Sequence, residues 1–316
     1  MIKPGLCCIS LALQERDPPV KFQTLTFKRF NSLSRDEALE ILGDRILNNM
    51  IATNDIIKYC ANKNWCYRLS SDLMPLISYD KANVDLSDLP NYSLIQDAFD
   101  QINYTIQRTK IRISAHPDQF NVLASTNEQS VSKTIKELNL MSGLMDRFGL
   151  SADYCTPINI HINNRQGSNE DIVARFMTNF SRLDENCRKR LVVENDDKIN
   201  CWSVRQLIDD FHSKTNIPIT FDYLHHAWHS DFMTEREAIE ECYMTWQNYQ
   251  PLFHYSESAP GNNPRKHADY ATQSINTYGL EFDLDFEIKQ KDLAIAHYQE
   301  LYPTFGCYQQ PTMAAN

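Results

Sequence analysis

The stretch Ile217-Pro218-Ile219-Thr220-Phe221-Asp222-Tyr223-Leu224-His225-His226-Ala227-Trp228-His229 decides the fold that this sequence predicts. Its first five residues are mostly apolar, which predicts a short buried strand. Asp222 follows where the strand would leave the core, and His225 comes three residues later in the next loop. A carboxylate and an imidazole at the end of a strand are typical of metal ligands or of acid and base groups. A solvated histidine-rich loop would look similar, so the rest of the chain must decide.

Seven other segments have the same strand-like character: 5–10, 65–69, 111–115, 158–160, 191–193, 252–253 and 281–286. Helical patterns are expected at 35–63, 95–107, 127–148, after the cap Ser168, and at 204–211, 235–246 and 292–302. Residues 17–29 read as a loop, and a Pro/Gly/Asn-rich loop follows the seventh strand. Alternating strands and helices are typical of an α/β fold, here a (β/α)8 TIM-type barrel. We expect one domain over residues 1–302 and a flexible tail over 303–316.

Composition limits the class of protein. The chain has 316 residues, 42% hydrophobic and 23% charged, as in an ordinary soluble globular protein. It has no run of 18 or more apolar residues, and its first residues lack an apolar segment long enough for a signal peptide, so we expect neither a membrane span nor a signal peptide. Nine cysteines without a CxxC pair indicate reduced thiols, so we expect a cytoplasmic location. The net charge of −10 argues against a general nucleic-acid binder. Bound cations would weaken that argument, because they neutralise part of the acidic charge.

Ligand-type side chains follow six of the predicted strands. They are His116, His161, Glu194, Asp222, His254 and Glu287 at strand ends, with His225 and His267 in the loops after strands six and seven. In a barrel these strand ends form one ring, so the side chains should converge. Each alone could be a core histidine, a cap or an ion-pair partner, and we interpret Asp196 and Asp197 as capping or solvated groups. Burying all eight together would be costly without cations, so we expect a metal site.

The ligand mix is imidazole and carboxylate without thiolate, which favours manganese, zinc or iron. Eight ligands exceed the needs of one ion, so two or three divalent ions are expected. Such clusters serve phosphodiester hydrolysis, and they also occur in barrel sugar isomerases.

Several strings together resemble the UV damage endonuclease family. They are SAHPDQF (114–120), INIH (158–161), VENDD (193–197), FDYLHH (221–226), KHADY (266–270) and FEIKQKD (286–292), with TLTFKRF (24–30) and YRLSS (67–71). The resemblance implies a barrel with up to three metal ions, usually manganese, that incises DNA on the 5′ side of damaged bases, especially UV photoproducts. Glu194 would bridge a metal pair held with His116, His161, Asp222, His254 and Glu287, while His225 and His267 would hold a third ion.

The resemblance also implies catalytic roles for Glu194, Glu287 and His254. Gln119 and Phe120 match the loop that enters the duplex beside the lesion. An amide and an aromatic ring there can fill the gap left by a flipped nucleotide. The alternative for Phe120 is a loop residue folded back onto the barrel. We expect phosphate contacts from the cations near the mouth, which are Arg265, Lys266, Lys289 and Lys291.

Two departures from the family pattern stand out. Leu252 occupies the position of a family lysine that is modified to a carboxylate-like group near the metals. Leu6 and Ser10 stand where an aromatic residue and an asparagine are usual near the lesion pocket. These departures put lesion preference and the third metal site in question.

We therefore expect a monomeric endonuclease that acts on damaged double-stranded DNA, including abasic sites. A metal-dependent sugar isomerase or epimerase on the same barrel is the first alternative. A non-catalytic DNA-binding relative is the second.

Overall fold

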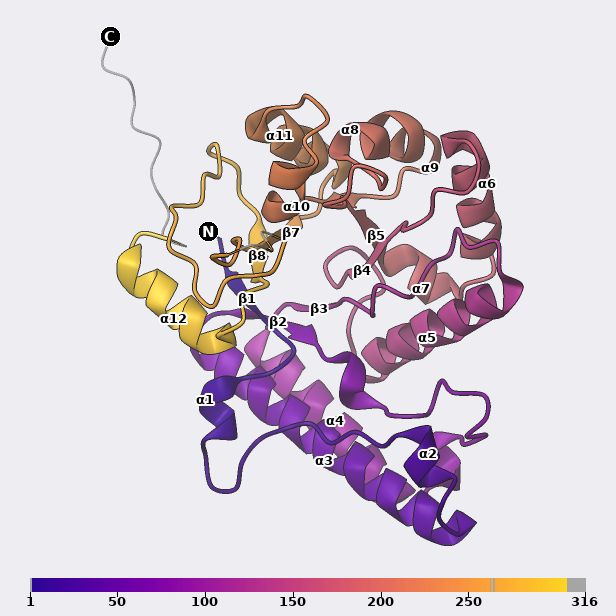
Figure 1. Cartoon of the computed structure of the whole chain (residues 1–316). Helices are drawn as coiled ribbons and strands as arrows, with labels where there is room; N and C mark the ends of the chain where they lie inside the picture. Colours follow the sequence, from indigo (N-terminus) through magenta and orange to yellow (C-terminus); the bar gives the residue numbers. More distant parts are fainter. Residues whose placement is uncertain (1, 262, 264, 306–316) are drawn as a thin grey trace.

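Eight short parallel strands form the centre of the computed structural model, which describes residues 2–261, 263 and 265–305 (Figure 1). They are β1 (Pro4–Cys7), β2 (Cys66–Leu69), β3 (Ile113–Ala115), β4 (Ile158–His161), β5 (Leu191–Glu194), β6 (Ile219–Thr220), β7 (Leu252–Tyr255) and β8 (Asp283–Phe286). Their order in the sheet is β6-β5-β4-β3-β2-β1-β8-β7. A parallel bridge between Asp222 and His254 joins β6 to β7, and the His254 backbone N–H donates to Phe221 O at 2.9 Å. The predicted (β/α)8 barrel is therefore confirmed.

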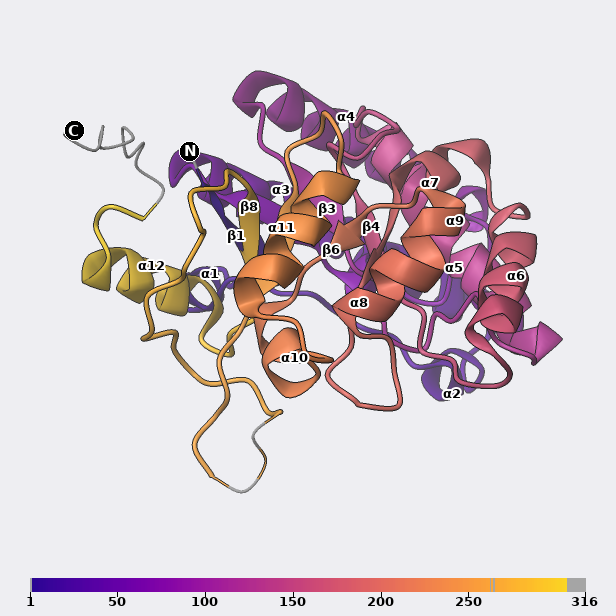
Figure 2. The same ribbon diagram turned by 90° about the horizontal axis from the view of Figure 1, so that it is seen from above.

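Helices lie outside the strands in both views (Figures 1 and 2). The α-helices are α1 (Leu11–Gln14), α2 (Phe27–Phe30), α3 (Arg35–Asn62), α4 (Tyr92–Thr109), α5 (Glu128–Arg147), α6 (Asn169–Phe180), α7 (Glu185–Arg190), α8 (Val204–Gln206), α9 (Ser213–Thr215), α10 (Tyr223–Trp228), α11 (Glu235–Thr245) and α12 (Lys291–Leu301). The 3-10 turns are η1 (Ser71–Leu73) and η2 (Leu86–Asp88), and η3 (Leu207–His212) is a π-helical segment between α8 and α9. None of the described helices is long and apolar enough to cross a membrane.

The longest helices begin and pack as their sequences predict. Ser34 caps α3 through a capping box with Glu37, and Ser168 caps α6 in the same way with Asp171. The apolar residues of α3 recur every three or four positions, which turns one face of the helix to the core. That face includes Leu42, Ile46, Met50 and Ile57, all buried.

Five short helices were not predicted, and one of them, α9, follows directly on the helical segment expected at 204–211. Helix α2 lies in the expected loop over 17–29, and α1, α7 and α10 each span no more than six residues, too few for a helical period to be visible in the sequence. Helix α10 matters for function, because Asp222 is its N-cap and the predicted loop ligand His225 lies on it. The segment from 256 to 282 contains no helix among its described residues, as its composition predicts.

Elements near the two ends of the described chain contact each other. Strand β1 lies between β2 and β8. The buried carboxylate of Asp292, at the start of α12, accepts hydrogen bonds from Ser10 Oγ at 2.8 Å and from the backbone N–H of Leu11 at 2.6 Å. Ser10, expected near the lesion pocket, is buried in this contact, and Leu6 is buried on β1.

The opposite end of the barrel is held by Arg112. Its guanidinium donates to Asp283 Oδ2 at 2.9 Å and to the backbone carbonyls of Pro251 and Tyr154. In TIM barrels the carboxyl ends of the strands usually carry the active site, and the opposite end contributes to stability. Phe305, in the expected tail, packs against Tyr298, while residues 306–316 lie outside the described part, so the domain boundary stays a prediction.

Candidate active site

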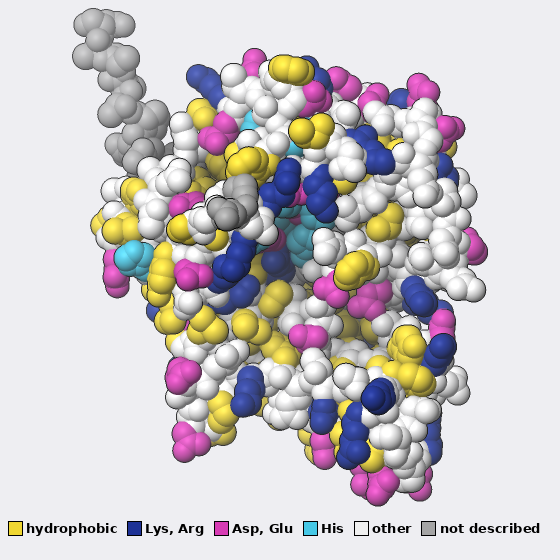
Figure 3. Space-filling view, viewed as in Figure 1, with side chains coloured by type: hydrophobic (Ala, Val, Ile, Leu, Met, Phe, Trp, Pro, Cys, Tyr) yellow, Lys and Arg dark blue, Asp and Glu magenta, His cyan; other side chains and the backbone are white. Residues whose placement is uncertain are grey.

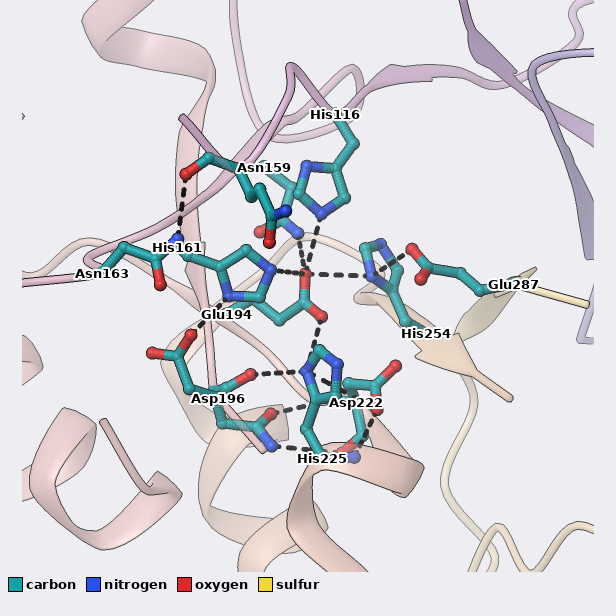
Figure 4. Close-up of polar contacts among 12 residues, drawn as sticks. His116, Asn159, His161, Asn163, Glu194, Asp196, Asp222, His225, His254 and Glu287 are labelled. Atoms are coloured by element: carbon teal, nitrogen blue, oxygen red, sulfur yellow. Dashed lines mark hydrogen bonds and ion pairs between the residues drawn. The ribbon is translucent and has the colours of Figure 1, made fainter. Parts of the chain in front are cut away.

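Glu194, the last residue of β5, lies at the centre of the predicted ligands (Figure 4). It is fully buried, and four imidazoles surround its carboxylate. Its Oε2 lies 3.2 Å from His116 Nε2, 3.7 Å from His161 Nε2 and 3.1 Å from His254 Nδ1, while Oε1 lies 3.2 Å from His225 Nδ1. Four different strand ends and one short helix therefore deliver side chains to a single point.

Two further carboxylates adjoin this group. Glu287 Oε1 lies 3.3 Å from His254 Nδ1. Asp222 is fully buried, and its Oδ1 accepts a hydrogen bond from the His225 backbone N–H at 2.7 Å. Ligand atoms lie within 4.8 Å of one another in three groups: His116–His254–Glu287, His116–His161–Glu194 and Glu194–Asp222–His254. The structure thus brings seven of the eight predicted ligands together.

The ligand atoms at this centre fit divalent cations. Asp222 Oδ2 and His254 Nδ1 are buried and have no hydrogen-bond partner in the described part of the chain. Buried polar atoms are normally paired, and an unpaired carboxylate oxygen is costly. Imidazole nitrogen and carboxylate oxygen are ligands of zinc, iron and manganese, so cations held between these atoms would satisfy them.

The pKa shifts at this centre also indicate that its carboxylates need positive charge beside them. Burial raises the pKa of Glu194, but the surrounding histidines, His254 first, outweigh burial and hold the pKa well below its usual value. Burial lowers the pKa of His254, yet Glu194 reverses this and raises it to about 9. The pKa of His225 is also raised well above its usual value, since Asp222 and Glu194 outweigh its burial. Without a metal ion, protons on the imidazoles compensate the carboxylates.

Three residues that the sequence did not predict as part of the centre hold the ligands in place. Asn159 Nδ2 donates to Glu194 Oε2, and Arg68 pairs with Glu287 Oε1. Asp196 Oδ1 lies 3.1 Å from His161 Nδ1 and the residue is buried, so the interpretation of Asp196 as a capping or solvated group was wrong. All three lie in strings that carry the family resemblance, Arg68 in YRLSS, Asn159 in INIH and Asp196 in VENDD, but nothing in those strings marks them as partners of the ligands.

His267 is the predicted ligand that the structure does not bring to the cluster. It lies in the loop between β7 and β8, half-buried and bridged to Ser258, and no described contact joins it to the other seven ligands. Its role as a ligand stays a prediction. Leu252 is buried on β7, two residues before His254.

The predicted DNA-contacting residues lie on loops at the carboxyl ends of the strands. Phe120, after β3, is 81% exposed, and Gln119 beside it is exposed too. Arg265 forms an ion pair with Asp197 at 2.8 Å and lies 5.9 Å from the ring centre of Trp228.

The other predicted cations differ in exposure. Lys266 is exposed, and Lys289 is half-buried and 3.7 Å from Asp269. Figure 3 shows histidines at the bottom of a hollow, with Lys and Arg side chains beside it.

The fold and the site together define a (β/α)8-barrel protein with a histidine–carboxylate centre suited to divalent ions. The family described as UV-endonuclease UvdE matches residues 2–309 of the chain. The chain belongs to this family and is an endonuclease.

Individual relatives agree with this assignment. A UV DNA damage endonuclease of Bacillus cereus is 28% identical over 306 residues, which cover 93% of this chain and 92% of that protein. The crystal structure of SacUVDE matches with a TM-score of 0.80 and 28% identity, covering 97% of this chain and 99% of that one. The 3-keto-D-glucoside 4-epimerase YcjR from E. coli, at 10% identity and a TM-score of 0.54 over 97% of this chain and all of its own (100%), shares the fold alone.

Proposed function

We propose that this DNA-repair endonuclease is metal-dependent and hydrolyses the phosphodiester bond on the 5′ side of a damaged nucleotide in double-stranded DNA. UV photoproducts are the proposed main substrates, and abasic sites are further ones. The observation that carries the proposal is the convergence of four imidazoles on the buried carboxylate of Glu194. Such a centre has little use in a structural role, because apolar side chains of similar volume would fill the barrel at lower cost.

The centre would hold two or three divalent ions, with Mn²⁺ the proposed metal. Glu194 would lie between the ions, and Glu287, Asp222 and the histidines would surround them. When bound, the ions supply a water molecule whose pKa is lowered towards ~7 and positive charge for the phosphate oxygens. Neighbouring side chains hold the ligands in position. Asn159 donates a hydrogen bond to Glu194, Arg68 forms an ion pair with Glu287, and Asp196 contacts His161. A third ion would involve His225 and His267.

The loops would position the DNA. Phe120 projects into solvent instead of folding back onto the barrel, so its ring is free to stack in the duplex in place of a displaced base. Gln119 would fill the rest of that gap. Lys266, Lys289 and Arg265 would contact phosphates, although Arg265 must first exchange its ion pair with Asp197.

The two alternatives explain less. A sugar isomerase would share the fold, as YcjR does, but it has no use for an exposed Phe120, and the family of this chain is an endonuclease family. A non-catalytic DNA-binding relative would have no need for ligands held this closely together. We also propose that the protein acts as a monomer in the cytoplasm, which size-exclusion chromatography and fractionation would test.

The deciding experiment offers the Mn²⁺-loaded protein an end-labelled duplex with one UV photoproduct, the same duplex without damage, and a duplex with one abasic site. We expect one cut on the 5′ side of the lesion and none in the undamaged duplex. An aldose sugar serves as the control substrate. Isomerisation of the sugar without incision of any duplex would overturn the proposal.

A further inference from the structure

Asp285 is a fully buried carboxylate that none of the roles above uses. It lies on β8, two residues before Glu287 and directly opposite His254 in the β7–β8 register. Its Oδ2 accepts a hydrogen bond from Ser114 Oγ at 3.2 Å. Its Oδ1 has no hydrogen-bond partner among the described residues. The charge of Arg68 offsets part of the cost of burying this carboxylate, but Oδ1 stays without a hydrogen bond among the described residues, which points to a role in the neighbouring centre.

The two ring nitrogens of His254 face different carboxylates. Nδ1 lies 3.1 Å from Glu194 Oε2 and 3.3 Å from Glu287 Oε1, on the side of the proposed metal centre. Nε2 faces the other way, with Asp285 Oδ2 at 4.0 Å. That distance is an electrostatic contact, longer than a hydrogen bond. A negative charge on this side nevertheless favours a proton on Nε2 over a proton on Nδ1.

Strand β1 leaves room for this carboxylate. Gly5 is the register partner of Asp285, and a Cβ atom at Gly5 would lie 1.9 Å from Asp285 Oδ1. No side chain larger than hydrogen fits there while Asp285 keeps its place. Three strands therefore surround Asp285. Gly5 on β1 leaves space for it, Ser114 on β3 donates a hydrogen bond to it, and His254 on β7 faces it.

We propose that Asp285 is a positioning residue for His254. It holds the imidazole in the tautomer with the proton on Nε2 and so keeps Nδ1 free to bind a cation. Buried carboxylates behind metal-binding histidines fix the ring and its tautomer in this way. The inference rests on the proposed metal centre, but it concerns a residue that belongs to none of the candidate ligand groups.

The test compares Mn²⁺ binding, by isothermal titration, in the wild-type protein, Asp285→Asn and the control Asp283→Asn. Asp283 is also a buried carboxylate on β8, but it pairs with Arg112 at the far end of the barrel. An amide can donate its N–H to Nε2 and so favour the wrong tautomer. We expect Asp285→Asn to bind Mn²⁺ about 10- to 100-fold more weakly. The control should keep the wild-type affinity.

A spectroscopic readout separates positioning from a loss of fold. Long-range ¹H–¹⁵N spectra of the Zn²⁺-loaded, ¹⁵N-histidine-labelled protein report which ring nitrogen carries the proton. We expect the proton of His254 on Nε2. A proton on Nδ1, or wild-type Mn²⁺ affinity in a folded Asp285→Asn, would overturn the inference.

If Asp285→Asn does not fold, Ser114→Ala replaces it, because it removes the hydrogen bond to Asp285 without touching a ligand. Weaker Mn²⁺ binding would then support the inference, and unchanged binding would overturn it. No Mn²⁺ binding by the wild type would overturn the metal centre itself, so the two failures are distinguishable.

Discussion

Asp222 and His254 form the β-bridge that closes the barrel between β6 and β7, and their side chains belong to the same group of candidate ligands. The backbone of these two residues pairs β6 with β7, and their side chains would bind a cation at the carboxyl ends of the same strands. Ion binding, if the centre is occupied as proposed, would therefore be coupled to barrel closure at this point. A bound ion should stabilise the barrel where its strand pairing is weakest.

Removal of the metal should act on both activity and stability. We expect excess EDTA to abolish incision and to lower the melting temperature, because a ligand that binds only the folded state adds about 2.7 kcal/mol at 100 times its Kd. Added Mn²⁺ should restore both. The measurements are incision of the damaged duplex and circular dichroism melting. Incision that persists after prolonged dialysis against EDTA would contradict metal dependence.

Glu194→Gln should remove the centre while leaving the barrel folded. The amide has no charge to offset the cations and four imidazoles around it, so we expect the metal content to fall to background and incision to be lost. Elemental analysis and an incision assay test this. Glu257→Gln is the matched control, because Glu257 is also buried but is hydrogen-bonded within the β7–β8 loop to Tyr255 and Thr272. Full activity in Glu194→Gln would rule out the assigned centre.

Metal binding should release protons at neutral pH. The pKa of His254 in the metal-free protein is raised to about 9, so at pH 7 the imidazole is protonated, whereas a ligand must be neutral. The apparent affinity for Mn²⁺ should therefore rise with pH, up to about tenfold per unit for each proton released. The rise from this group should level off above pH 9. Titration calorimetry in two buffers of different ionisation enthalpy measures the protons, and equal heats in both would refute the expectation.

Phe120→Ala should weaken binding to damaged duplex without changing stability. Stacking of an aromatic ring on a base is worth roughly 1–3 kcal/mol, so we expect about a ten- to hundredfold loss of affinity. The side chain is 81% exposed, and its removal should leave the melting temperature and metal content unchanged. Phe232→Ala is a suitable control, since Phe232 is 97% exposed on a different loop. A large loss of stability with unchanged DNA affinity would identify Phe120 as a packing residue.

The sequence predicted the barrel and most of the centre because the strands are short apolar runs, and six of the eight predicted ones end in a ligand-type residue. This pattern is local, and the fold turns it into a ring. Arg68, Asn159 and Asp285 were missed for the opposite reason. Their roles come from contacts between residues 35 to 219 positions apart, such as Arg68 with Glu287, and such contacts leave no local pattern in the sequence. Asp285 is of a ligand type, but it lies within its strand, two residues before Glu287.

His225 illustrates a different limit. It was predicted as a loop ligand, and it does reach Glu194, but from helix α10, which is only six residues long. The same carboxylate of Asp222 caps that helix and belongs to the candidate centre. The sequence pattern identified Asp222 only as a ligand. It did not reveal that Asp222 also caps the helix α10 that positions His225.

The place of β1 between β2 and β8 has a consequence for biosynthesis. The ribosome synthesises Asp285 some 280 residues after Pro4, so one edge of β1 stays unpaired during that interval. At about 5–20 residues per second, that interval lasts roughly 15–60 s. An unpaired strand edge recruits other chains during such an interval. A nascent chain arrested before Asp292 would lack the carboxylate that holds Ser10 and Leu11, and one arrested before Asp283 would also lack β8 and leave an open, aggregation-prone sheet.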